Sequence, residues 1–171
     1  MSSPLLAVAA LALFPISVAY AAASDLLTMT ISNRIPVALA AGFLVLAPLA
    51  GMDLQTIGLH WAVGGAVLLI AFACFAMGWI GGGDAKLAAA IALWFGPDHG
   101  VAFIGLSAVL GGVLTLLMLM FRRTPIPDGA TRAPWVARLH RADEGVPYGI
   151  ALAAAALIIY PDTAWMGLVA S

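Results

Sequence analysis

Residues 58–96 read GLHWAVGGAVLLIAFACFAMGWIGGGDAKLAAAIALWFG, and this stretch decides the class of the fold. No Asp, Glu, Lys or Arg interrupts it up to Ile80, and a helix needs about 20 apolar residues to cross a hydrocarbon core of roughly 30 Å. The whole chain agrees, because 64% of its 171 residues are hydrophobic and 9% are charged. Soluble domains carry about 25% charged residues. We therefore expect an integral membrane protein.

Six stretches of the chain are apolar enough to form membrane helices. They lie at about 4–24, 35–52, 58–80, 85–96, 101–121 and 146–161. The fourth is short, so a protein of five spans stays open as an alternative. The runs are continuously apolar and do not alternate with period two, which favours helices over a barrel. The sequence predicts an all-α, polytopic membrane protein of about six transmembrane helices, with residues 1–171 forming a single domain.

The basic residues indicate the orientation of these helices, because cytoplasmic connections are enriched in Lys and Arg. All seven lie in the first, third and fifth connections, at Arg34, Lys86, Arg122, Arg123, Arg132, Arg138 and Arg141. The second and fourth connections carry none. We therefore expect residues 122–145 to form a cytoplasmic loop and both termini to be non-cytoplasmic.

The sequence contains few candidate metal ligands. Cys74 is the single cysteine, there is no CxxC pair or HExxH motif, and His60, His99 and His140 are expected in separate connections between spans. A protein metal site needs several such ligands in one place. We expect no metal, no cofactor and no nucleic-acid partner, while the oligomeric state is left open.

Two of the eight acidic residues join directly onto apolar sequence. Asp25 follows YAAAS at the end of the first span, Asp84 follows three glycines before the fourth, and the expected orientation puts both on one side of the membrane. A carboxylate at this depth is costly, and the default expectation is a functional group with a partner. Two carboxylates placed close together cannot both ionise easily, so one stays protonated while the other accepts a proton from water.

Such a pair carries out the chemistry of an aspartic peptidase. The ionised group activates a water that attacks the scissile carbonyl, and the protonated group donates to the developing oxyanion or the leaving amine. The glycines at 81–83 allow unusual backbone dihedrals and a close approach of substrate, and Lys86 is expected to hold charge near the ionised carboxylate. Because a helix N-terminus favours an anion, Asp84 is expected to be the more acidic member and Asp25 to carry the proton.

A purely structural interpretation of the same residues stays open. A Gly-rich break followed by Asp84 is also a common loop and N-cap, and Asp25 after Ser24 is also a common helix end. In that case neither carboxylate takes part in chemistry.

Two segments together resemble a known family. GGGDAKL matches the GxGD signature, with Gly81, Gly83 and Asp84 in its fixed positions. SDLLTMTISNRIP resembles a companion motif in which an aspartate is followed by an asparagine, here Asp25 and Asn33. With PWVARLHRADEGVPYGIALAAAAL near the C-terminus, the chain resembles the type IV prepilin peptidases, in the short form that serves tight-adherence (Flp-type) pili.

The resemblance implies an endopeptidase of the bacterial inner membrane. Its substrates would be prepilins and pilin-like proteins, cut just after a glycine at the cytoplasmic face to release a short basic leader, with no metal required. Asp25 and Asp84 align with the catalytic aspartates of the family, and the supporting motif residues are Gly81, Gly83, Lys86 and Asn33. Since the chain begins at its first span, we expect no N-methyltransferase domain.

The 122–145 loop contains apolar residues at helical spacing with arginines beside them, namely Trp135, Val136, Leu139, Arg138 and Arg141. This pattern is typical of an interfacial segment. One interpretation is an anchor to anionic lipid. The other is that its acids, Asp143 and Glu144, help to bind a basic leader.

Two other classes of function remain open. A small proton-coupled transporter or channel subunit would use Asp25 and Asp84 as a relay, but a relay would spread its carboxylates across the membrane. A structural membrane protein would tolerate Asn at both positions, with effects on stability alone.

Overall fold

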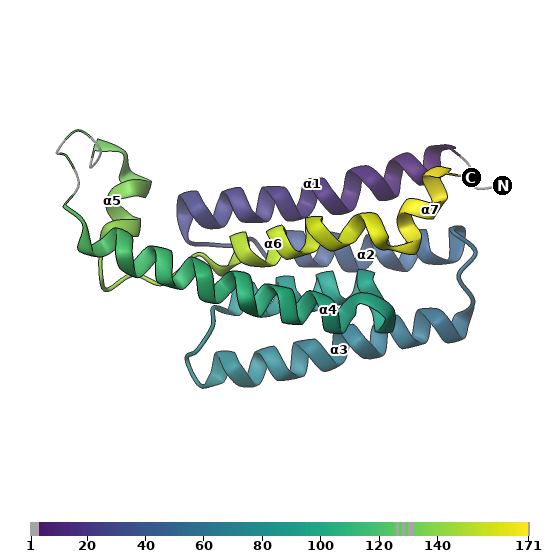
Figure 1. Ribbon diagram of the computed structural model, residues 1–171. Helices are drawn as coiled ribbons and strands as arrows, with labels where there is room; N and C mark the ends of the chain where they lie inside the picture. The colour runs from purple at the N-terminus through teal and green to yellow at the C-terminus, as the bar shows by residue number, and fades with distance from the viewer. Residues whose placement is uncertain (1–3, 126, 128, 130–131, 171) are drawn as a thin grey trace.

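The computed structural model describes residues 4–125, 127, 129 and 132–170. Over that part of the chain every regular element is a helix (Figure 1). The expected all-α class is therefore confirmed for the described residues. In chain order the elements are α1 (Pro4–Thr28), α2 (Arg34–Leu49), α3 (Leu54–Ala76), α4 (Gly82–Arg123), α5 (Pro134–His140), α6 (Tyr148–Ile159), the 3₁₀ turn η2 (Tyr160–Asp162) and α7 (Ala164–Ala170).

Within the described residues, three helical stretches are long and apolar enough to cross a membrane, and two shorter apolar helices accompany them. The long ones are Val8–Thr28, Leu54–Ala76 and Gly82–Arg123, and the shorter ones are Arg34–Leu49 and Tyr148–Asp162. Large apolar side chains such as Ile16, Leu69 and Val101 are more than half exposed on the outer faces of these helices. An extensive exposed apolar surface of this kind marks contact with a membrane. The protein is an integral membrane protein.

Helix α4 changes direction within its length. Its ribbon turns back at Gly96, so that residues 97–123 run toward the end of the bundle at which α4 begins (Figure 1). Gly96 has φ 59° and ψ −159°, a conformation that is essentially restricted to glycine, and the ring of Pro97 prevents continuation of the preceding helix. We call residues 82–95 the first arm of α4 and residues 97–123 its second arm. They correspond to the fourth and fifth stretches expected from the sequence.

His60 lies inside α3, and not in a connection between spans as the sequence had indicated. Helix α3 begins at Leu54 because the side chain of Asp53 caps it, accepting a hydrogen bond of 2.9 Å from the backbone N–H of Thr56. The early start carries His60 into the bundle, where it is buried with Nδ1 2.8 Å from the carbonyl oxygen of Leu93. The other two histidines also lie in helices, in α4 and α5.

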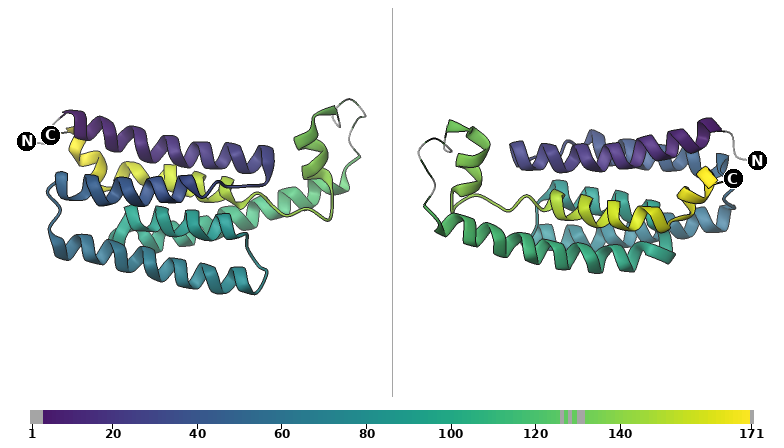
Figure 2. Two further views of the ribbon diagram at one scale, coloured as in Figure 1. Left: turned by 180° about the vertical axis from the view of Figure 1, so that it is seen from behind. Right: turned by 45° about the horizontal axis from the view of Figure 1, so that its top comes forward.

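The first arm of α4 is the centre of the bundle, with α2 and α3 on either side of it (Figure 2). Its residues 87–95 are all buried. Trp94 packs against Phe14, Phe43 and Trp165, with ring centroids 4.6 to 6.1 Å apart. Its indole N–H also donates a hydrogen bond of 2.9 Å to the carbonyl oxygen of Leu39. This packing fixes the arm whose first turn carries Asp84.

The connections of the chain sort to two ends of the bundle. The α1–α2 and α3–α4 connections and the segment with α5 lie at one end, and the start of α1 and helix α7 lie at the other (Figure 1). The basic residues of the described chain belong to the end that holds α5. This agrees with the expectation that Lys and Arg occur in every second connection. The side of the membrane that this end faces stays a prediction.

Candidate active site

Asp25 lies in the last turn of α1, which ends at Thr28. Its side chain is buried, with 5% of the residue exposed. The carboxylate oxygen Oδ2 accepts a hydrogen bond of 2.8 Å from the backbone N–H of Gly149, in the first turn of α6. Helix α6 therefore fixes the position of the Asp25 carboxylate.

Asp84 lies in the first turn of α4, which the sequence predicted to begin just after it. Its oxygen Oδ1 is buried and has no hydrogen-bond partner among the described residues. Most buried polar atoms in proteins are hydrogen-bonded, so an exception calls for an explanation. This oxygen is free to bond a ligand that enters the site.

The two aspartates share one cavity. It has a volume of about 230 Å³ and is lined by Asp25, Met29, Thr30, Ile31, Gly81, Gly82, Gly83 and Asp84. Its walls come from the end of α1, the α1–α2 connection and the start of α4, all at the α5 end of the bundle. The structure thus brings together the two carboxylates that sequence analysis singled out. Asp25 lies in the last turn of α1 and Asp84 in the first turn of α4. The expected assignment of the proton to Asp25 stays a prediction.

Gly81 and Gly83 provide the space that the cavity requires. A Cβ atom on Gly81 would lie 2.7 Å from Oδ2 of Asp84, closer than real Cβ contacts allow. A Cβ atom on Gly83 would lie 3.1 Å from Cβ of Ile31 and 3.5 Å from its carbonyl oxygen. The glycines of the motif therefore let the start of α4 approach both its own carboxylate and the α1–α2 connection.

Gly149 is a site residue that sequence analysis did not identify. A Cβ atom here would lie 2.8 Å from Oδ2 of Asp25 and 2.9 Å from Cδ1 of Ile31. Its contact with Asp25 spans 124 residues of sequence. No local spacing links positions so far apart, and the available signal was a lone glycine at the start of the apolar run GIALAAAAL.

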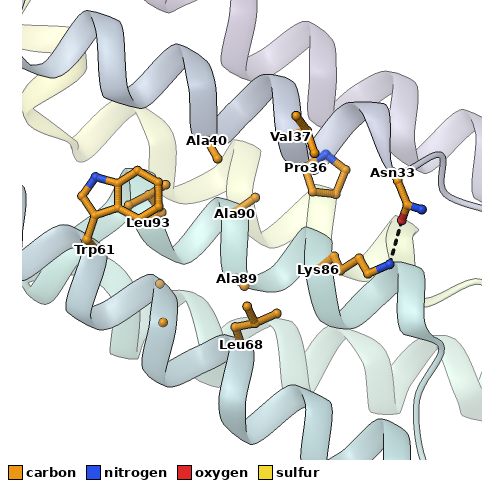
Figure 3. A pocket seen from close by; sticks show the side chains of 12 residues that line it. Asn33, Pro36, Val37, Ala40, Trp61, Leu68, Lys86, Ala89, Ala90 and Leu93 are labelled. Carbon is orange, nitrogen blue, oxygen red and sulfur yellow. Dashed lines mark hydrogen bonds between the residues drawn. The ribbon is translucent and has the colours of Figure 1, made fainter.

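Lys86 and Asn33 lie together, but outside the cavity of the aspartates. The ammonium group of Lys86 donates a hydrogen bond of 2.8 Å to Oδ1 of Asn33 (Figure 3). The pair lies at one end of a separate apolar cavity of about 350 Å³ between α2, α3 and the first arm of α4. Side chains two residues apart on a helix point to different faces, which separates Lys86 from Asp84. The charge expected beside the carboxylates lies at Asn33 instead.

Helix α5 is tied to the rest of this end of the bundle by arginines. Arg122 donates hydrogen bonds to the carbonyl oxygens of Leu139, at 2.9 Å, and Gly145, at 2.7 Å. Arg138 donates one of 2.8 Å to the carbonyl oxygen of Leu27, one residue before the end of α1. The residues expected at helical spacing do form a helix, and its attachment to α1 and α4 places it near the aspartate cavity.

The acids of the 122–145 loop differ in their surroundings. Arg141 and Asp143 form an exposed ion pair, and the hydrogen bonds from the Arg141 guanidinium hold the pKa of the Asp143 carboxyl below its usual value. Glu144 is partly buried, and Asp128 lies outside the described residues. The role of these acids in binding a leader stays a prediction.

Metal ligands do not gather anywhere in the described part of the chain. No group of three or more His, Cys, Asp and Glu side chains stands close enough together to hold an ion. The two carboxyl groups that line the aspartate cavity are suited to acid–base chemistry.

Comparison with known proteins gives one match. A family model described as "Type IV leader peptidase family" matches residues 12–116, more than half of the chain. The matched range contains both aspartates of the cavity, while α5, α6 and the contact from Gly149 lie beyond it. No curated protein and no solved structure matches the chain.

Proposed function

The chain belongs to the type IV leader peptidase family, and we propose that it is a membrane-embedded aspartic endopeptidase. In this proposal it removes the leader from type IV prepilins. Membership of the family implies a peptidase. The observation that supports the aspartic mechanism is the cavity of about 230 Å³ that Asp25 and Asp84 line together.

In the proposed reaction, one carboxylate is ionised and the other protonated when substrate enters the cavity. The ionised group takes a proton from a water while the water oxygen bonds to the scissile carbonyl carbon. The protonated group donates to the carbonyl oxygen as negative charge develops there. The carboxyl group that took the water proton then gives it to the amide nitrogen, while the other carboxylate takes a proton from a hydroxyl of the tetrahedral intermediate. The C–N bond breaks, the products are a new carboxyl end and a new amino end, and both aspartates return to their starting states.

The finer features of the proposal concern substrate and orientation. We propose that the substrates are Flp-type prepilins, cut after a glycine at the cytoplasmic face of a bacterial inner membrane. The two arms of α4 would count as separate crossings in a protein of six spans. The gathering of basic residues at the end that holds the aspartate cavity supports a cytoplasmic position for that end.

A proton relay is the competing function. A relay that carries protons through a membrane needs ionisable groups at successive depths. Asp25 and Asp84 instead face one cavity at one end of the bundle. This arrangement supports the peptidase, which needs both carboxyl groups at one bond of the substrate.

Co-expression with a Flp-type prepilin, in a host without its own leader peptidase, tests the proposal. Leader removal is followed by gel shift and mass spectrometry for wild type, Asp25→Asn and Asp84→Asn. Asp53→Asn is the matched control, because Asp53 is an exposed N-cap whose role Asn also fills. We expect wild type and the control to make a single cut after a glycine, and the other two variants to make none at equal membrane levels. Normal processing by Asp25→Asn or Asp84→Asn would refute the mechanism.

A further inference from the structure

A second cavity extends from Asp84 along the bundle and is open at its surface. It has a volume of about 440 Å³ and lies between α3, both arms of α4 and α6. On α3 its wall extends from Cys74 to Val67, which is about 10 Å of helix at 1.5 Å per residue. Because Asp84 also lines the cavity of about 230 Å³, a chain that occupied both cavities would pass this carboxylate.

Two buried polar atoms in this second cavity have no partner. They are Oδ1 of Asp84 and Oγ of Ser107, and neither has a hydrogen bond within the described structure. Only 9% of Ser107 is exposed. A serine or threonine in a helix often donates to the carbonyl four residues before it, as Thr115 on the same arm does to Gly111 at 2.8 Å. The hydroxyl of Ser107 does not, so it is free to bond a ligand.

Most of the rest of the lining is apolar. Asp84 is the one charged residue among the described residues that line the cavity, and much of the wall consists of glycine and alanine. A volume of this size falls within the range of roughly 300–1,000 Å³ that is usual for binding sites. The occupant should therefore be apolar, with a main-chain or side-chain polar group at the depth of Ser107.

We infer that this cavity binds the apolar, membrane-embedded segment of the substrate that adjoins the scissile bond, and that Ser107 hydrogen-bonds to the main chain of that segment. The inference rests on the proposed function. A peptide bond must leave its helix to be cut, and the backbone groups thus freed inside a membrane need new partners. Ser107 supplies one of them. The polar leader then lies on the other side of Asp84, toward the loops that line the smaller cavity.

A matched pair of glycine variants tests the inference. A Cβ atom would meet nothing within 4 Å at either Gly112 or Gly105, both on the second arm of α4, but only Gly112 lines the cavity. We expect Gly112→Leu to lower kcat/KM for a full-length precursor by about tenfold or more, as filling an apolar subsite does, and Gly105→Leu to leave it unchanged. Ser107→Ala should lower kcat/KM by about three- to tenfold, the loss of one hydrogen bond.

Cross-linking identifies the occupant directly and does not depend on how the glycine variants fold. A photoreactive amino acid replaces either Ala108, which lines the cavity, or Val109, which is 64% exposed on the outside, in the inactive Asp25→Asn protein. We expect adducts with the apolar segment of the precursor at position 108 and not at 109. Adducts with lipid alone at 108, or with the leader, would overturn the inference.

Different results refute the proposed function and the inference about the cavity. If wild type leaves the precursor uncut, the proposed function is wrong and the inference is wrong with it. If wild type and Gly112→Leu cut the precursor at equal rates, the inference alone is wrong.

Discussion

Replacing Gly149 by alanine tests whether α6 positions the Asp25 carboxylate. The backbone N–H of Gly149 donates to Oδ2 of Asp25 at 2.8 Å, and a Cβ atom on Gly149 would lie at the same distance of 2.8 Å from that oxygen. Ordinary van der Waals contact begins at 3.4 Å, so the methyl group and the carboxylate must separate by about 0.6 Å. This displacement is as large as the positional tolerance of catalytic groups, which is about 0.5 Å.

The expected result is a loss of rate without a loss of binding. A misplacement of about 1 Å can cost a hundredfold in rate, so we expect kcat to fall by about ten- to a hundredfold. KM should change little, because Gly149 does not line the cavity inferred to hold the apolar segment of the substrate. The assay is cleavage of a purified precursor by purified protein in lipid nanodiscs, over a range of substrate concentrations.

Gly58→Ala is the control, since a Cβ atom on Gly58 of α3 would meet nothing within 4 Å. It should retain the kcat of wild type. A wild-type kcat for Gly149→Ala would refute the claim that this glycine positions Asp25. A fall in kcat together with an equal fall in folded protein would assign Gly149 a role in stability instead.

Two further predictions concern the fold and the motif lysine. Gly96→Ala should destabilise the protein by about 1–3 kcal/mol, the cost of a strained backbone. The reason is that φ of Gly96 is 59° and that the new Cβ would overlap the ring of His60. The measurement is the unfolding midpoint in detergent, and a midpoint equal to that of Gly58→Ala would contradict the prediction. Lys86→Met should keep a kcat close to wild type, because Lys86 lies outside the cavity of Asp84; a loss as large as that of Asp84→Asn would show that the lysine takes part in chemistry.

The helices could be predicted from the sequence wherever an apolar run was long and bounded by polar residues. The Gly96–Pro97 step was visible as a break between two apolar runs, and the structure shows that the helix turns back there. The start of α3 was predicted too late because the cap that Asp53 forms was not recognised. Helix α7 was not predicted, since its place depends on Trp165, which packs on Trp94 and donates to its carbonyl oxygen at 3.0 Å.

The two aspartates could be predicted because each is a charge joined directly to apolar sequence, a property of its local neighbours. The expected orientation of the spans placed both on one side of the membrane, but it did not predict that they line one cavity. The partners of these groups could not be predicted, because Gly149 reaches Asp25 and Asn33 reaches Lys86 from distant parts of the chain. Contacts of this kind are set by how helices pack, and spacing along one sequence does not contain that information.

The most direct test of the central claim is the pH dependence of kcat/KM for purified protein in nanodiscs, measured for wild type, Asp25→Asn and Asp84→Asn on one precursor. A pair that needs one carboxyl group ionised and the other protonated gives a bell-shaped profile whose two limbs belong to the pair. We predict this bell for wild type and no cleavage at any pH for either variant. Cleavage by Asp25→Asn or Asp84→Asn at any pH within the bell would contradict the account.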